Sequence, residues 1–427
     1  MIRAWLSRAP AGILSGYAIV ASFCTYFCMY GFRKPFAAAT YEGQFFSSSL
    51  GLKTAFVTSQ VIGYCISKYA GIKICSEVSS RYRAVFLCGL IVFAELSLVA
   101  FALLPGNAKV IAIFANGLPL GMVWGLVVWY LEGRRTSEIM LAGLSCSYIV
   151  ASGMVKDVGR WMMRQGVSEY WMPSTTGLMF LPFFFFSVWL LHQIPIPDKL
   201  DELARVKREP MLSGQRVAFM RTFLTGMVLL FVAYFCLTAY RDIRDNYQVD
   251  ILLDLGQKVD GAIFTRMELW IAFGVMAAMA ALNLIQDNWK GLIGAYIIMV
   301  SGTLILGVST LLLDWGYVSG VTWMILVGLG AYLAYVPFGA VLFDRMIAST
   351  RVAGTAVFAI YLSDAIGYSG SVLVQLFKNF SQPTSTWFEF FRLFTYFLSV
   401  VGTVCLVCSC AYFLVFHRRP NSSQVTK

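Results

Sequence analysis

Residues 13–32 read ILSGYAIVASFCTYFCMYGF, about twenty residues in a row without a charged side chain. An α-helix needs roughly 20 apolar residues to cross about 30 Å of hydrocarbon. The run is too long for the apolar region of a cleavable signal, and no Ala-x-Ala-like cleavage site follows it. We therefore predict that this stretch is a membrane-spanning helix.

Runs of the same kind recur along the chain and predict twelve spans. Lipid offers no hydrogen-bond partners to the backbone, so we expect helices, and the alternation typical of membrane β-strands is absent. The predicted spans are residues 13–33, 54–74, 83–104, 109–131, 138–157, 174–194, 220–241, 264–286, 290–313, 318–343, 352–377 and 389–416. The fold class is thus an all-α integral membrane protein.

One extended polar stretch, residues 194–216, interrupts this series after the sixth span. It carries three prolines and eight charged residues between Pro195 and Pro210. We predict a six-helix half at residues 1–194, a cytoplasmic linker at 195–217 and a second six-helix half at 218–427. Two such halves place a substrate between them, near the middle of the membrane.

The composition excludes most other classes. Of 427 residues, 59% are apolar and 13% are charged, whereas soluble domains carry about 25% charged residues. Lys and Arg number 33 against 22 Asp and Glu. No compact basic domain is available for nucleic acid, so we attribute part of the surplus to cytoplasmic loops. We predict that the protein spans the cytoplasmic (inner) membrane with both termini in the cytoplasm. In this topology 20 basic residues, including four between residues 68 and 83, fall on the cytoplasmic side and 13 on the other side.

Cysteine and histidine give no sign of a metal, a cofactor or catalysis. Most of the ten Cys lie inside apolar runs, including Cys405 and Cys408, and the chain has two His. No zinc-type cluster occurs. A membrane-embedded enzyme is one alternative, but His192 and Asp198 stand six residues apart across two prolines, a spacing that fits no catalytic motif we know. We predict that the protein is not an enzyme.

Cations at two helix ends are the main functional candidates. Arg33 and Arg241 each lie about 20 positions into the first span of their half, and Lys34 and Arg244 follow closely. Guanidinium groups at equivalent depth on opposite sides of a cavity favour a phosphate or carboxylate ligand. Two alternatives remain open: the cations snorkel to the outer interface, or nearby Asp242 and Asp245 neutralise them.

Other intramembrane polar residues extend this hypothesis. Lys156 is a third candidate cation, although an ion pair with Asp157 is an alternative. Asp364 and Glu95 each lie about 12 positions into a span, so they are candidates for coupling or counter-ion roles, with neutral packing as the alternative. Four tyrosines inside spans are candidate hydrogen-bond donors to the substrate: Tyr148, Tyr335, Tyr361 and Tyr368.

Charges at predicted cytoplasmic loops are candidate gating residues. They would hold the two halves together on the inner side, and ordinary positive-inside charge is the alternative reading. The residues are Glu132, Arg134, Arg135, Asp344 and Arg345.

Several short motifs resemble the major facilitator superfamily, and among its members the organophosphate:phosphate antiporters most closely. Arg33-Lys34-x-Phe36 is similar to that family's first-helix motif, and Arg241 with a downstream Asp is similar to its seventh-helix motif. Tyr335-x-Pro337, Gly354-Thr355-Ala356 and Gly367-Tyr368-x-Gly370-Ser371 resemble its tenth and eleventh helices. The loop after the second span lacks the family's Asp-Arg pair. The resemblance implies the major facilitator fold and a role for Arg33 in anion binding.

Together these observations predict a secondary transporter that moves a small organic anion, a phosphate ester or a carboxylate, by alternating access. The expected partners are this anion and the lipid bilayer, and we expect a monomer. The alternative from another class is a transporter-like membrane sensor that binds the anion without moving it.

Overall fold

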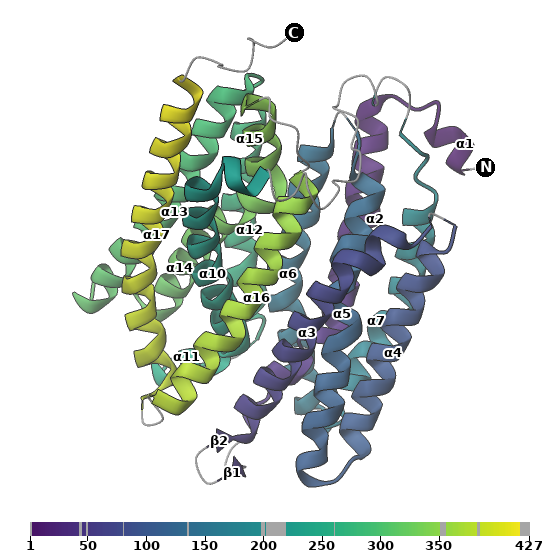
Figure 1. Cartoon of the computed structure of the whole chain (residues 1–427). Coiled ribbons are helices and arrows are strands. Elements are labelled where there is room, and N and C mark those ends of the chain that lie inside the picture. Colours follow the sequence, from purple (N-terminus) through teal and green to yellow (C-terminus); the bar gives the residue numbers. More distant parts are fainter. Residues whose placement is uncertain are drawn as a thin grey trace.

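The computed structural model describes residues 2–41, 45–47, 50–79, 81–134, 136–197, 201, 219–259, 261–350, 356–381 and 385–418. Within these ranges the chain is nearly all helical (Figure 1). The predicted linker at 195–217 lies largely outside the described residues, as do Arg135, Gly354 and Thr355.

The first group of helices follows a short N-terminal helix, α1 (Ile2–Leu6). It consists of α2 (Ala11–Arg33), α3 (Leu52–Glu77), α4 (Arg83–Leu103), α5 (Lys109–Leu131), α6 (Ser137–Arg164) and α7 (Met172–His192). Between them lie the 3-10 turns η1 (Pro35–Ala38) and η2 (Gly106–Ala108) and the antiparallel strands β1 (Phe45–Ser47) and β2 (Leu50–Gly51).

The second group begins with α10 (Leu224–Asn246), which a short helix, α11 (Gln248–Asp254), follows. Next come α12 (Ile263–Asn283), α13 (Asn288–Asp314) and α14 (Gly320–Pro337). A π-helix, η3 (Phe338–Leu342), joins α14 to α15 (Phe343–Thr350), and α16 (Ala356–Ser381) and α17 (Trp387–Arg418) complete the fold.

Each of the twelve predicted spans coincides with a long helix in the described part of the chain. Ten of these helices are long and apolar enough to cross a membrane. The other two, α3 and α16, have 26 residues each but bury polar side chains along their length, including Gln60, Lys68, Asp364 and Gln375. The number of helices that cross the bilayer therefore remains a prediction.

The helices pack as two bundles that meet along two helix pairs. In the first bundle α2 contacts α6 and α7, and α5 contacts α3 and α4; in the second, α10 contacts α16 and α17, and α13 contacts α14 and α17. Between the bundles, α3 packs on α16 and α6 packs on α12. Figure 1 shows α3 and α16 side by side at this seam.

The two ends of the bundle differ in what they hold. α1 and the end of α17 lie at one end, which we call the α1 end, and α11 with the two strands lies at the other, the α11 end (Figure 1). The first helix and the end of the last helix therefore lie on the same side of the bundle, as the prediction of two cytoplasmic termini requires.

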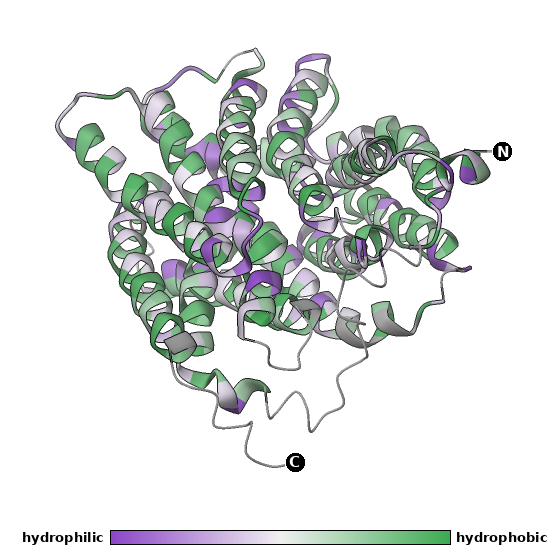
Figure 2. Cartoon of the chain, turned by 90° about the horizontal axis from the view of Figure 1, so that it is seen from above, coloured by the Kyte–Doolittle hydropathy of each residue, from purple (hydrophilic) through white to green (hydrophobic). Residues whose placement is uncertain are grey.

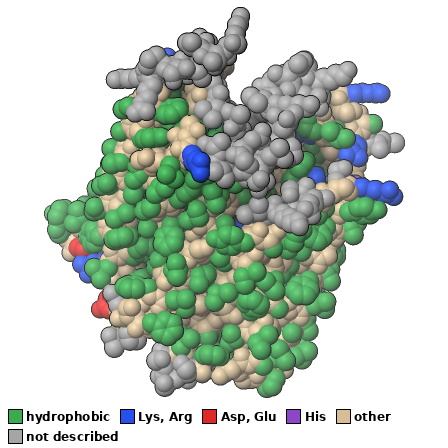
Figure 3. Space-filling view, viewed as in Figure 1, with side chains coloured by type: hydrophobic (Ala, Val, Ile, Leu, Met, Phe, Trp, Pro, Cys, Tyr) green, Lys and Arg blue, Asp and Glu red, His purple; other side chains and the backbone are tan. Residues whose placement is uncertain are grey.

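The outer surface is apolar and the interior holds charge. Large apolar side chains such as Val85, Phe183 and Trp270 are more than 60% exposed, whereas Lys34 and Lys156 are at most 1% exposed. Figure 3 shows apolar side chains covering one face, and Figure 2 shows hydrophilic positions inside the bundle as well as at its ends. This distribution suits a protein whose solvent is hydrocarbon.

Small residues let α3 and α5 approach closely. A Cβ atom on Gly117 of α5 would collide with the Gln60 carbonyl and would lie 2.9 Å from the Tyr64 nitrogen, both on α3. A Cβ on Gly63 would collide in the same way with the Phe114 carbonyl of α5. Backbone approach through small residues is typical of packing between membrane helices, and here it positions the polar face of α3.

We predict that Gly117→Ala lowers the thermal stability of the purified protein. Ala ordinarily favours a helix by roughly 0.5–1 kcal/mol over Gly, but overpacking at this contact costs about 1–3 kcal/mol. The matched control is Gly89→Ala on α4, where a Cβ meets nothing within 4 Å. Thermal unfolding in detergent measures both variants, and an equal or higher Tm for Gly117→Ala would contradict the close approach.

Candidate functional site

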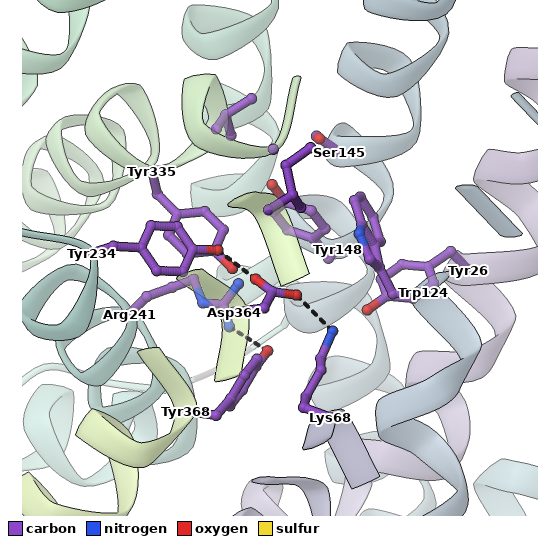
Figure 4. A pocket seen from close by; sticks show the side chains of 13 residues that line it. Tyr26, Lys68, Trp124, Ser145, Tyr148, Tyr234, Arg241, Tyr335, Asp364 and Tyr368 are labelled. Atoms are coloured by element: carbon purple, nitrogen blue, oxygen red, sulfur yellow. Dashed lines mark hydrogen bonds and ion pairs between the residues drawn. The ribbon is translucent and has the colours of Figure 1, made fainter. Parts of the chain in front are cut away.

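A small cavity lies between the two bundles (Figure 4). Its volume is about 30 Å³, enough for one or two water molecules. The side chains that line it come from both bundles: Tyr26, Lys68, Trp124, Ser145, Tyr148, Tyr234, Arg241, Tyr335, Val336, Gly339, Ile360, Asp364 and Tyr368. Polar and aromatic groups thus converge where the halves meet.

Lys68 of α3 and Asp364 of α16 form the ion pair that crosses this cavity. The Lys68 ammonium lies 2.8 Å from Asp364 Oδ2, and the Tyr234 hydroxyl donates to Asp364 Oδ1 at 2.6 Å. Both charged residues are about 95% buried. The carboxylate therefore has a partner on each of its oxygens, one from each bundle (Figure 4).

Arg33 and Arg241 converge on one carboxylate. Arg241 Nη2 lies 3.3 Å from Asp242 Oδ1, and Arg33 Nη2 lies 3.9 Å from the same oxygen. Arg241 also donates to the Tyr368 hydroxyl at 2.8 Å. The two predicted arginines lie close together, as their equal depth in the first span of each half suggested. Both contact Asp242, however, so the arrangement matches the alternative in which Asp242 neutralises the arginines.

Aromatic faces hold both guanidinium groups in place. Arg33 lies 4.0 Å from the centre of the Tyr64 ring, and Arg241 lies 4.4 Å from the centre of the Tyr335 ring. Cation–π contacts of this kind are stronger when the cation is desolvated. Of the two arginines, Arg241 lines the cavity and Arg33 lies behind it, toward the α11 end.

Asp245 is the centre of a second cluster, one helical turn closer to the α11 end. Its Oδ2 lies 2.6 Å from the Lys34 ammonium and its Oδ1 lies 3.0 Å from the Lys156 ammonium. The Ser152 hydroxyl also donates to this carboxylate. Lys34 and Lys156 of the first bundle are therefore both buried in ion pairs with Asp245 of the second bundle. Asp157, the alternative partner for Lys156, instead accepts hydrogen bonds from Thr265 at 2.6 and 2.7 Å.

The groups joined by these contacts carry unequal charge. They comprise five cations, Arg33, Lys34, Lys68, Lys156 and Arg241, and three carboxylates, Asp242, Asp245 and Asp364. None of the eight residues is more than 7% exposed. Buried charge is costly unless it is paired, so an excess of two positive charges favours an anionic ligand.

At the α11 end, the ion pairs found between described residues of the two bundles have the same polarity. In each pair the cation belongs to the first bundle and the carboxylate to the second, including the outermost pair, Lys53 with Asp250 at 2.7 Å. Near the α1 end the polarity reverses, because Arg345 of α15 lies 2.9 Å from Glu138 of α6. The described seam is thus bridged by ion pairs on both sides of the cavity.

The remaining predicted residues fall at different distances from the cavity. Tyr148, Tyr335 and Tyr368 line it. Tyr361 lies against Gly125 and lines a smaller adjoining cavity, which Glu132 also lines. Glu95 lies inside the first bundle, where it accepts a hydrogen bond from Ser174 at 2.6 Å, and it does not line either cavity.

Two predicted gating arginines occupy the α1 end. Arg345, besides its pair with Glu138, donates to the Gln286 carbonyl at 3.3 Å. Arg134 donates to the Pro195 carbonyl and lies 3.9 Å from Asp201. Asp344 is the second residue of α15, next to Arg345, and Arg135 lies outside the described residues. Through Glu138, the predicted gating residue Arg345 joins the two bundles at this end. Among the described residues, no group of three or more His, Cys, Asp or Glu is placed to hold a metal.

Sequence reasoning missed Lys68, Tyr234 and Trp124. Lys68 was counted among the cytoplasmic cations between residues 68 and 83, and that assignment is wrong because its side chain is 4% exposed inside α3. A signal was present: Gln60, Tyr64 and Lys68 repeat every four residues, which places them on one helix face. One of the 20 basic residues assigned to the cytoplasmic side, Lys68, therefore belongs to the candidate site.

Comparison with solved structures identifies the fold. A mutant of the nucleoside transporter NupG is 12% identical, with 94% of this chain and 99% of that chain covered and a TM-score of 0.57. A D-xylose-proton symporter is 14% identical, with 92% and 96% covered and a TM-score of 0.59. A peptide transporter, POT, solved with alafosfalin, is 16% identical, with 96% of both chains covered and a TM-score of 0.60. The fold is that of the major facilitator superfamily, as predicted.

At the level of sequence, no curated protein matches the chain. None of these comparisons bears on the narrower resemblance to the organophosphate:phosphate antiporters, which stays a prediction. A family model described as "Family of unknown function (DUF5690)" matches residues 35–415. This match spans nearly the whole chain, and the protein belongs to that family.

Proposed function

We propose that this protein is a secondary transporter that moves a small organic anion across the membrane by alternating access. The observation that carries the proposal is the buried excess of two positive charges around the cavity between the bundles. A carboxylate or phosphate ester would neutralise this excess. The likeness to a nucleoside transporter, a sugar symporter and a peptide transporter supports a transport role, and it leaves the substrate open.

Lys68 and Arg241 are the cations that a substrate would meet in the cavity. Each is held by a group that a substrate's anion can replace, Asp364 for Lys68 and the Tyr368 hydroxyl for Arg241. Asp364 then serves as the counter-ion of Lys68 when the site is empty, and it keeps the Tyr234 hydrogen bond when Lys68 turns to the substrate. Arg33 supports Arg241 by sharing Asp242.

The ion pairs across the seam support alternating access. The pairs at Asp242, Asp245 and Asp250 keep the bundles together at the α11 end, and Arg345 with Glu138 does so near the α1 end. Rocking of one bundle against the other would break one set at a time. The cavity of about 30 Å³ is too small for an organic anion. One of the two sets of ion pairs must therefore break before a substrate can enter.

We predict that Lys68→Gln and Arg241→Gln each abolish anion counterflow in proteoliposomes. Hydrogen bonds to charged groups contribute about 1.5–3 kcal/mol, so each change weakens substrate binding roughly ten- to hundredfold. The matched control is Arg392→Gln, whose partner Asp314 lies in the same bundle and whose side chain is 42% exposed. Retained counterflow in both cavity variants would contradict the assignment. Anion binding without counterflow in the unaltered protein would support the sensor alternative.

We also predict that Asp245→Asn opens the α11 end. The change keeps the shape of the side chain but removes the charge that Lys34 and Lys156 share, and an unpaired buried charge destabilises the closed arrangement by about 3–5 kcal/mol. Spin labels at Arg164 and Lys258 report the separation, since the adjacent Arg160 and Val259 join the bundles by a 3.2 Å hydrogen bond. We expect a longer distance population in Asp245→Asn and an unchanged one in Asp314→Asn; an unchanged distribution in both would refute the closure role.

A further inference from the structure

We propose that the substrate of this site is an anion that carries an aromatic ring, such as an aryl carboxylate or an aryl phosphate. The proposal rests on the proposed function and narrows it from organic anions in general to one class. Its basis is the composition and arrangement of the cavity walls.

Six of the thirteen residues that line the cavity are aromatic, and each comes from a different helix. They are Tyr26, Trp124, Tyr148, Tyr234, Tyr335 and Tyr368. All but Trp124, which is partly buried, are at most 8% exposed. A pocket built from rings on six helices retains aromatic walls in both bundles when these separate.

The rings form two walls, one on each bundle. On the first bundle, Tyr26, Trp124 and Tyr148 contact one another, with ring centres 5.0 Å apart for Tyr26 and Trp124 and 5.7 Å for Trp124 and Tyr148. On the second, Tyr234 and Tyr335 are stacked at 5.0 Å. Tyr148 and Tyr335 meet across the seam edge to face, at 6.3 Å. An aromatic ring of the substrate inserted between these walls could replace the Tyr148–Tyr335 contact with two ring contacts, one to each wall.

The cations lie at one edge of these walls. Arg241 lies over the Tyr335 ring and bonds to Tyr368, and Lys68 bonds to Asp364. In Figure 4 both cations lie below the rings of Tyr148 and Tyr335, Arg241 on the left and Lys68 on the right. Tyr26 and Trp124 lie on the opposite side of the view from Arg241. A ligand whose anionic group reaches Lys68 and Arg241 therefore places the rest of its body between the aromatic walls.

The polar inventory argues for an aromatic ring over a sugar. Apart from the tyrosine hydroxyls and the Trp124 indole N–H, the polar lining side chains are Lys68, Ser145, Arg241 and Asp364, and no Asn or Gln is among the described lining residues. A ring with several hydroxyl groups needs paired donors and acceptors around its edge, which amide side chains supply. The walls near Trp124 offer aromatic faces, together with Val336 and Ile360.

The test is a binding series with matched anions on the purified full-length protein in lipid nanodiscs. Benzoate is compared with cyclohexanecarboxylate and acetate, and phenyl phosphate with inorganic phosphate and glucose 6-phosphate. We expect the aromatic anions to bind roughly five- to tenfold more tightly than their non-aromatic counterparts of the same charge. The carboxylate and phosphate arms distinguish the two head groups.

Variants connect the preference to the walls. Trp124→Leu and Tyr148→Leu should each remove the preference for benzoate over cyclohexanecarboxylate, and a cooperative melting curve shows that each variant is folded. Trp270→Leu, which changes a ring 67% exposed on the outer surface, should leave the preference unchanged.

Two failures can be told apart. Anion binding with equal affinity for aromatic and non-aromatic members, or tighter binding of glucose 6-phosphate than of phenyl phosphate, would overturn the aromatic class and leave the transporter proposal standing. No binding of any member, in a protein whose melting curve is cooperative, would overturn the anion site itself and the aromatic class with it.

Discussion

The burial of five cations between two helical bundles is the constraint on which the rest of the structure depends. A charged side chain inside a membrane protein is expensive unless it is paired, and here the partners of Lys34, Lys68 and Lys156 are all on the opposite bundle. The relative position of the halves is therefore fixed by charge as well as by packing. The same need explains why α3 and α16, which carry Lys68 and Asp364 to the seam, are less apolar than their neighbours.

Because all the described pairs at the α11 end join a first-bundle cation to a second-bundle carboxylate, separation of the halves divides the charge unevenly. Arg33, Lys34, Lys53, Lys68 and Lys156 stay on one side, and Asp242, Asp245, Asp250 and Asp364 on the other. The first bundle then presents a positive surface to whatever enters. In this closed arrangement the carboxylates of the second bundle occupy the places that an anionic ligand would take.

Much of the fold was predictable from the sequence because apolar runs define spans whatever their tertiary surroundings. Equal depth in the chain also placed Arg33 and Arg241 near each other. The sequence could not show that Asp242 lies between them, because that depends on how α10 is rotated about its axis. Lys68 was missed because a single Lys near the end of a moderately apolar run is typical of a loop boundary; its four-residue spacing from Tyr64 and Gln60 was the available evidence. Pairing between the bundles, as at Lys156 and Asp245, required the tertiary structure.

The imbalance of charge separates this site from ordinary structural ion pairs in the same interface. Arg244 has one carboxylate partner, Glu268 at 2.9 Å, and Lys53 has one, Asp250. These pairs are balanced and need nothing further to stay buried. The clusters at Asp242 and Asp245 instead hold two cations each against one carboxylate, so together they are short of two negative charges. Arg241 of the Asp242 cluster lines the cavity. Such an excess raises the cost of burial, because two cations must share one carboxylate. The anionic substrate that we propose would balance this excess on entering the space between the two halves.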